Sequence, residues 1–162
     1  MKITLISFHD GASPRKTGFH FWAEILAARG HDVRFLTVGS SLISLFKKNG
    51  KQLVKPFNQW VGIAPNIKKY TWVPAIHPFN TGKNWLDTIL TPAFKIFPFL
   101  FPSDILNDIR NSDYFIVESG AGPLLMPKLV KAAPEAKFIY NLSDKFSVVK
   151  FHPLIIKGNL DS

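Results

Sequence analysis

The sequence predicts a single α/β domain built on a doubly wound, mostly parallel sheet. Short apolar runs rich in β-branched and aromatic residues alternate with longer segments of helical pattern, which is the order of elements in such folds. The first helical segment is followed by Gly30, a residue that commonly ends helices, and the next apolar run begins directly after it. At 162 residues the chain is long enough for one domain, or for half of a two-domain enzyme.

Five apolar runs are expected to form strands. They are short, as strands are, and the last follows Pro134, which separates it from the helical pattern before it. In chain order they cover residues 2–7, 32–38, 66–73, 114–118 and 136–142.

Helices are expected between these strands. Ser103 and Asp104 supply an N-cap and an acidic first turn for one of them. In chain order the helices cover residues 18–29, 42–48, parts of 85–101, 103–111 and 122–132.

The segment 85–102 is unusually apolar and carries four phenylalanines within residues 94–101. Pro92, Pro98 and Pro102 prevent one continuous straight helix, and Asp87 and Lys95 make a membrane span costly. Two interpretations stay open: a core segment that covers the sheet, or an interfacial element whose aromatic side chains, Phe97 and Phe99 among them, enter a lipid headgroup region.

The charge favours an anionic partner. The formal net charge is +9, and between residues 41 and 100 Asp87 is the only acidic residue. Such a patch fits phospholipid, pyrophosphate or nucleic acid, although a solvated lysine face is the simpler interpretation of any single lysine. The lysines concerned are Lys47, Lys48, Lys51, Lys55, Lys68, Lys69, Lys83 and Lys95.

Several site classes find no support in the sequence. There is no cysteine, which excludes disulfides and thiolate chemistry, and the five histidines lack metal-ligand spacing, so we expect no structural metal. No stretch of about 18 uncharged apolar residues suggests a membrane span. Walker loops, GxGxxG turns and nucleophile elbows are also missing.

Polar residues stand where the predicted strands end. Asp144 follows the last strand, Glu118 ends the fourth, and His9 and Asp10 follow the first. Ligands of open α/β sheets bind outside the carboxyl ends of strands, so a carboxylate there can act as a general base. Each residue also has a structural interpretation, because Asp144 can cap a helix, Glu118 can accept backbone hydrogen bonds, and His9 with Asp10 can hold a loop.

Two loops offer further candidate contacts. The loop 9–18 is polar, contains Arg15 and Lys16, and leads into a helix N-terminus, where anions such as pyrophosphate bind; it fits a plain surface loop equally well. In the segment HPFNTGKNW, Asn80, Thr81 and Trp85 carry groups suited to sugar hydroxyls and ring faces, although Pro78 and Gly82 could mark only a tight turn.

Four segments together resemble the N-terminal half of the GumK-like, membrane-associated glucuronosyltransferases. The first two are HPFNTGKNWL (77–86) and SDYFIVESG (112–120); the others are AKFIY (136–140) and the Ser143-Asp144 pair. The first strand ending in SFHD (7–10) and the helix ending in LAARG (26–30) are also similar. With gaps, the resemblance runs from about residue 3 to about residue 149.

The resemblance implies an inverting enzyme of the two-domain GT-B fold, of which this chain is the Rossmann-like acceptor-binding domain (1–150) followed by a tail (151–162). It implies Asp144 as catalytic base, with His9, Asp10, Asn80, Thr81, Trp85 and Glu118 as candidate acceptor contacts. The donor, UDP-glucuronate, would be held mainly by a second domain that this sequence does not contain, without a metal or other cofactor.

By the same resemblance, the acceptor would be a polyprenyl-pyrophosphate-linked oligosaccharide of exopolysaccharide biosynthesis. The enzyme would sit peripherally on the cytoplasmic face of the inner membrane, with an anionic membrane surface as partner and no nucleic acid. Membrane contact is expected from Lys47, Lys48, Lys51, Lys55, Lys95, Phe97 and Phe99. The charge alone supports a rival hypothesis, a non-catalytic basic module that binds nucleic acid or membrane.

Overall fold

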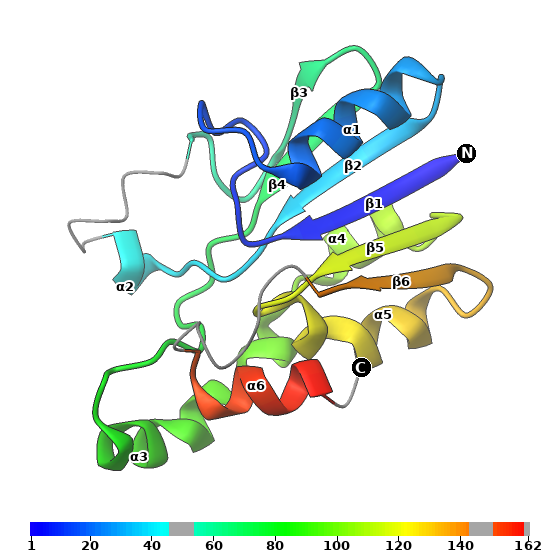
Figure 1. The fold of residues 1–162 in the computed structure, drawn as a ribbon. Helices are drawn as coiled ribbons and strands as arrows, with labels where there is room; N and C mark the ends of the chain where they lie inside the picture. The colour runs from blue at the N-terminus through cyan, green and yellow to red at the C-terminus, as the bar shows by residue number, and fades with distance from the viewer. Residues whose placement is uncertain (46–53, 143–150, 161–162) are drawn as a thin grey trace.

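The computed structural model describes residues 1–45, 54–142 and 151–160. Within them, the strands form one six-stranded sheet in the order β3-β4-β2-β1-β5-β6 (Figure 1). Five strands run parallel, and β3 pairs antiparallel with β4 at one edge. The strands are β1 (Lys2–Ser7), β2 (Asp32–Thr37), β3 (Trp60–Ala64), β4 (Ile67–Thr71), β5 (Tyr114–Glu118) and β6 (Lys137–Asn141). The predicted fold class is confirmed.

Helices cover both faces of this sheet (Figure 1). On one face α1 (Gly18–Ala28) packs its buried Phe19 and Ala23 against β1 and β2. The other face is covered by η2 (Phe97–Leu100), α4 (Ser103–Ile109), η3 (Gly122–Leu125) and α5 (Met126–Ala132), which share a larger apolar core. The central strand β1 is buried from Ile3 to Ser7 because it lies between these two cores.

All five predicted strands are present, with ends that differ by at most two residues. β3 was not predicted, because its residues alternate between half-buried and exposed without a strong apolar pattern. It forms a hairpin with β4 whose turn contains Asn66 in the left-handed conformation (φ 59°), which asparagine tolerates better than most residues. The predicted helix 42–48 begins at the expected residue as α2 (Leu42–Leu45), and its last residues lie outside the described part of the chain.

The apolar segment 85–102 divides between the core and the surface. It forms α3 (Asn84–Phe94) and then η2, and Phe97 is fully buried, with its ring centroid 4.8 Å from that of Trp72. Phe99, by contrast, is 80% exposed. The expectation that Phe97 meets a membrane is therefore wrong, because its side chain fills the core beneath η2. No helix in the described ranges is long and apolar enough to cross a membrane.

Residues 151–160, expected to be a tail, include a helix, α6 (Pro153–Leu160), which sequence reasoning missed. It packs against η3 and α3, and its side chains Ile155 and Asn159 are buried, as is His152 just before it. Figure 1 shows α6 beside the ends of the strands, close to α3. This part of the chain therefore belongs to the packed domain.

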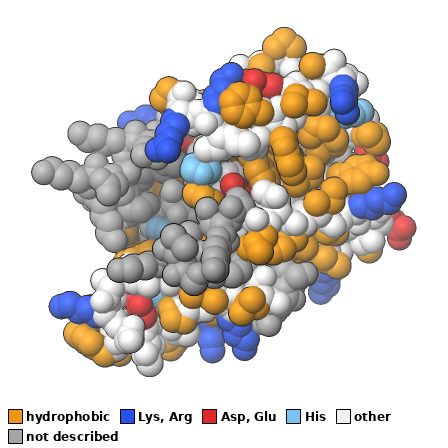
Figure 2. All heavy atoms as spheres, in the orientation of Figure 1, with side chains coloured by type: hydrophobic (Ala, Val, Ile, Leu, Met, Phe, Trp, Pro, Cys, Tyr) orange, Lys and Arg blue, Asp and Glu red, His pale blue; other side chains and the backbone are white. Residues whose placement is uncertain are grey.

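Two surfaces expose apolar side chains. Over α1, hydrophobic side chains gather on the face seen in Figure 2, and Phe21 and Ile25 are each about half exposed. The second group, which we call the α3 surface, is formed by α3, η2 and the residues between and beside them. It comprises the exposed Lys83, Trp85, Ile89, Lys95, Ile96, Phe99 and Leu100.

Candidate functional site at the carboxyl edge of the sheet

The carboxyl ends of the parallel strands meet at one edge, where open α/β sheets bind their ligands. A pocket of about 220 Å³ lies at this edge, and we call it the edge pocket. Phe8 follows β1, Gly39 follows β2, and Gly120 follows β5; the remaining walls come from residues 77–80, the HPFN loop, and from 151–155 at the start of α6. The edge pocket is thus assembled from five separate segments of the chain.

Two glycines shape its floor around Phe8. Gly39 and Gly120 have φ values of 95° and 122°, a conformation that side-chain-bearing residues rarely adopt. A Cβ atom at Gly120 would lie 3.3 Å from the ring of Phe8, and one at Gly39 would lie 3.6 Å from the Cβ of Phe8. The backbone conformation therefore favours glycine at both positions, and at Gly120 a side chain would also crowd the Phe8 ring.

The HPFN loop is held by hydrogen bonds to segments distant in sequence. The Nδ1 atom of His77 lies 2.9 Å from the hydroxyl of Ser41, and the amide of Asn80 donates to the backbone carbonyl of Phe151 at 3.0 Å. The side-chain oxygen of Asn80 also accepts the N–H of Gly82 at 2.7 Å. Asn80, a predicted acceptor contact, therefore lines the pocket and also closes the turn that follows.

Asp87 anchors the other end of this loop. Its carboxylate accepts the backbone N–H of Thr81 at 3.0 Å and the Thr81 hydroxyl at 2.8 Å. These bonds, the backbone one first, hold the pKa of Asp87 below its ordinary value, with nearby His152 acting in the same direction and burial opposing. Thr81 thus connects the loop to α3. Trp85 of α3 is 61% exposed and lies outside the pocket lining.

The turn after β5, residues 118–120, is also fixed from two sides. The hydroxyl of Ser7 donates to the buried carboxylate of Glu118. Asn159 of α6 accepts the N–H of Gly120 at 2.9 Å and donates to its carbonyl at 2.8 Å, and it also accepts the hydroxyl of Tyr140. α6 therefore holds the turn that forms one wall of the edge pocket.

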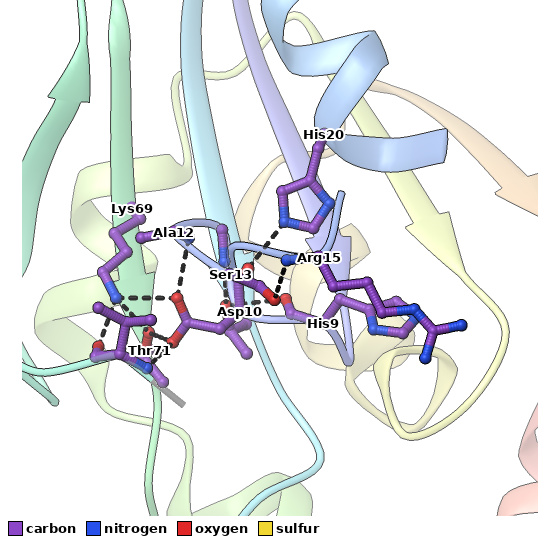
Figure 3. A network of polar contacts seen from close by, with 11 residues as sticks. His9, Asp10, Ala12, Ser13, Arg15, His20, Lys69 and Thr71 are labelled. Atoms are coloured by element: carbon purple, nitrogen blue, oxygen red, sulfur yellow. Dashed lines mark hydrogen bonds and ion pairs between the residues drawn. The ribbon is translucent and has the colours of Figure 1, made fainter. Parts of the chain in front are cut away.

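Asp10, after β1, lies in a buried polar network. Its carboxylate is 2.9 Å from the ammonium group of Lys69 and accepts the hydroxyl of Thr71 at 2.8 Å, and both of these residues come from β4 (Figure 3). It also accepts the backbone N–H groups of Ala12 and Val54. The Asp10 and Lys69 side chains are almost completely buried, so this carboxylate ties the loop to the sheet, away from solvent.

The rest of the loop after β1 is more open. His9 is half-buried, its N–H donates to the Ser7 hydroxyl, and its carbonyl accepts the hydroxyl of Thr37 at 3.1 Å. Arg15 is exposed, and Lys16 forms an exposed ion pair with Glu24. In Figure 3 the Arg15 side chain extends away from the Asp10 network.

The remaining predicted residues fall into two groups. Lys55 and Lys95 are exposed, Lys95 on the α3 surface. Asp144, Lys47, Lys48 and Lys51 lie outside the described residues. Among the residues that the structure describes, no group of three or more His, Cys, Asp or Glu side chains could hold a metal ion.

Sequence reasoning missed Phe8 and Asn159, and it assigned Lys69 to a basic patch for an anionic partner, whereas the structure buries Lys69 beside Asp10. Lys69 stands beside Lys68 in β4, but Lys68 is exposed while Lys69 is buried. The alternation of a strand indicates that neighbouring lysines face opposite sides of the sheet, which is a signal for one inward charge. Nothing in the sequence places that charge beside Asp10, because β1 and β4 are separated by β2.

Comparison with known families identifies the domain. Residues 5–160 match the family model described as "Glucuronosyltransferase GumK, N-terminal domain". The chain belongs to this family. All residues that line the edge pocket fall within this match.

A curated relative of this GumK-type domain is UDP-glucuronate:glycolipid 2-beta-glucuronosyltransferase from Xanthomonas campestris pv. campestris. The two are 29% identical over 145 residues, which is 90% of this chain but 36% of the relative. The chain thus spans about a third of that protein's length. Among solved structures, the C-terminal domain of a hydrogenase from Pyrococcus furiosus covers 87% of this chain and 90% of its own, with 11% identity and a TM-score of 0.40, too weak a likeness to carry an argument.

Proposed function

We propose that this chain is the acceptor-binding half of an inverting glucuronosyltransferase that acts on a lipid-linked oligosaccharide in exopolysaccharide biosynthesis. The observation that carries the proposal is the family match over residues 5–160, and the relative's printed name specifies UDP-glucuronate and a glycolipid. The edge pocket supports it, because it lies where an α/β domain of this type binds a ligand. UDP-glucuronate would be bound mainly by a second domain.

The chemistry requires one base on the acceptor side. The acceptor oxygen forms a bond to the anomeric carbon of glucuronate as the bond from that carbon to UDP breaks, and the hydroxyl proton passes to a carboxylate. We assign that role to Asp144, which comes shortly after β6 in the sequence. Positive groups of the second domain would stabilise the departing UDP.

Replacing the proposed base tests this assignment. In a full-length enzyme that contains this domain, Asp144→Asn should lower kcat for transfer to a glycolipid about 100-fold or more, which is the usual contribution of a positioned acid or base. Asparagine caps a helix about as well as aspartate, so the fold should survive. Near-wild-type transfer by Asp144→Asn would disprove the assignment, and the exposed Asp104→Asn serves as the matched control.

We also propose that the α3 surface docks on an anionic membrane. It combines exposed aromatic and aliphatic side chains with Lys83 and Lys95, and the only acid within α3, Asp87, is buried. Figure 2 shows hydrophobic side chains beside Lys or Arg at the end of the molecule where α3 lies in Figure 1. Each lysine near an anionic surface contributes about 1 kcal/mol. Flotation with phosphatidylglycerol vesicles should weaken in Lys95→Glu, and unchanged binding at low salt would contradict the docking.

A further inference from the structure

We infer that the edge pocket binds hydrocarbon: the portion of the acceptor's lipid chain nearest to its polar head, rather than a sugar ring. This inference rests on the proposed function for the statement that the acceptor is a lipid. It goes further by assigning the pocket to one chemical part of that acceptor. Three properties of the pocket support it: the chemistry of its lining, its size and its position.

The lining is mostly aromatic and aliphatic. Three phenylalanines, Phe8, Phe79 and Phe151, contribute to it, together with Ile155 and Ala121. Removal of such apolar surface from water is favourable at about 25 cal/mol per Å², and only an apolar ligand gains from it. A sugar would instead need hydrogen-bond partners for its hydroxyl groups.

The polar side chains of the lining already have partners within the protein. His77 bonds to Ser41, and Asn80 bonds to both Phe151 and Gly82. The ring of buried His152 accepts the N–H of Leu154 at 3.1 Å and lies 3.2 Å from the Asp87 carbonyl. Pockets for polar ligands place a few convergent polar groups toward the ligand, whereas here these groups stabilise the walls.

The size fits part of a ligand. Pockets that enclose a whole drug-sized molecule usually measure about 300–1,000 Å³. At about 220 Å³, the edge pocket is smaller than that range. It suits a short length of hydrocarbon whose remainder continues outside the pocket.

The position connects the pocket to the α3 surface. Phe94 of α3 is buried, and its ring centroid lies 5.3 Å from that of Phe79 and 4.9 Å from that of His152, both of which line the pocket. The helix that presents Trp85 and Ile89 outward therefore packs its inner side against the pocket wall. A lipid that leaves a membrane at the α3 surface would reach this pocket within the width of one helix.

Binding of short prenyl phosphates to this 162-residue chain tests the inference. The probes are inorganic phosphate, isopentenyl phosphate with five carbons and geranyl phosphate with ten, titrated by calorimetry below their aggregation concentrations. Each buried CH₂ group is worth about 0.8 kcal/mol, so geranyl phosphate should bind at least about tenfold more tightly than inorganic phosphate. Isopentenyl phosphate should fall between them.

Phe8→Ala should weaken geranyl phosphate binding about tenfold, because a buried phenyl ring contributes roughly 1.5–3 kcal/mol, while inorganic phosphate binding stays unchanged. Phe21→Ala is the matched control, since Phe21 is half exposed on α1, on a face distant from the pocket lining, and should change nothing. If Phe8→Ala does not fold, as judged by thermal unfolding, the half-buried Phe151→Ala replaces it.

Affinity that does not depend on hydrocarbon length, or that Phe8→Ala and Phe151→Ala leave intact, overturns the inference. Tight binding of methyl glucoside that Phe8→Ala and Phe151→Ala weaken, while geranyl phosphate binding stays intact, also overturns it, in favour of a sugar site. These failures are separate from failure of the proposed function. A full-length enzyme that transfers glucuronate while its pocket ignores chain length refutes only the pocket, and length-dependent binding without transfer refutes only the enzyme.

Discussion

The loop after β1 and the HPFN loop lie at the same edge of the sheet, yet they use polar residues in opposite ways. The first buries a carboxylate and an ammonium group, Asp10 and Lys69, and surrounds them with hydrogen bonds from Thr71 and Val54. The HPFN loop borders an apolar pocket, and its polar side chains His77 and Asn80 bond to other parts of the protein. The Asp10 carboxylate is therefore closed to ligands, while the HPFN loop borders the edge pocket.

This difference shows why a charged residue at a strand end is weak evidence for a binding site by itself. A carboxylate such as Asp10 can hold two segments of the fold together, since buried ions require partners on every side. Phenylalanine at a strand end is easily dismissed as core, but Phe8 lines the edge pocket together with Gly39 and Gly120. Variants at Lys69, Asn159 and Asp87 test whether the Asp10 network stabilises the fold and whether residues behind the pocket walls hold those walls in place.

The largest effect is expected in the Asp10 network. Lys69→Met leaves the buried carboxylate without its cation, so the free energy of unfolding should fall by about 3–5 kcal/mol in urea denaturation. Lys68→Met, one position away but exposed, should change it by less than about 0.5 kcal/mol. Equal effects of the two variants would mean that the buried pair does not organise this loop.

A smaller effect is expected where α6 supports the pocket. Asn159→Ala removes the partner of both the N–H and the carbonyl of buried Gly120, and unsatisfied buried groups cost about 1–3 kcal/mol. We expect a loss of about 2–3 kcal/mol, measured in the same way.

Asn107→Ala, on the exposed face of α4, is the control and should be close to neutral. A loss in Asn159→Ala no greater than in this control would show that α6 is dispensable for the turn.

Substitution of Asp87 should have the smallest effect on stability, and the size of that effect should depend on pH. Its folded pKa lies below the ordinary value of 3.8, so its contribution to stability is fully present above that value and is lost as the pH falls through the lower folded pKa. Asp87→Asn should therefore be less stable than the parent at pH 7. The two proteins should converge in stability as the pH falls through the lowered pKa of Asp87, measured by thermal unfolding across pH.

A gap in stability that persists unchanged at low pH would indicate that the Asp87 carboxylate contributes through packing alone. Glu135→Gln, exposed near the opposite edge of the sheet, should show no such convergence.

Most of the fold could be predicted from the sequence, but few of the contacts that build the candidate site could be. Alternating apolar runs predicted five strands within two residues of their ends, because buried parallel strands have strong apolar patterns. β3 and α6 were missed because one is a half-exposed edge strand and the other is a short helix whose apolar residues do not gather strongly on one side. In the segment 85–102, the core interpretation holds for Phe97 and Phe101, whereas Phe99 is exposed and its contact with a membrane stays a prediction.

The site could not be read because its contacts join distant positions. Asp10 and Lys69 are 59 residues apart, and Gly120 and Asn159 are 39 apart. The contact between Asp10 and Lys69 is determined by strand order, since Lys69 of β4 reaches Asp10, which follows β1, only after the sheet is assembled. The resemblance to GumK-type domains identified the family, which residue patterns alone could not do.

The double hydrogen bond between Asn159 and Gly120 has a consequence for how the domain is made on the ribosome. Residues 1–142 supply all six strands of the sheet that the structure describes, so this sheet can assemble while the chain is still being synthesised, N-terminal elements first. Asn159 emerges from the exit tunnel only after all of them, and until then Gly120 lacks its partner and the edge pocket lacks one wall. The wall of the pocket that depends on Asn159 can therefore form only after all strands of the described sheet have been synthesised.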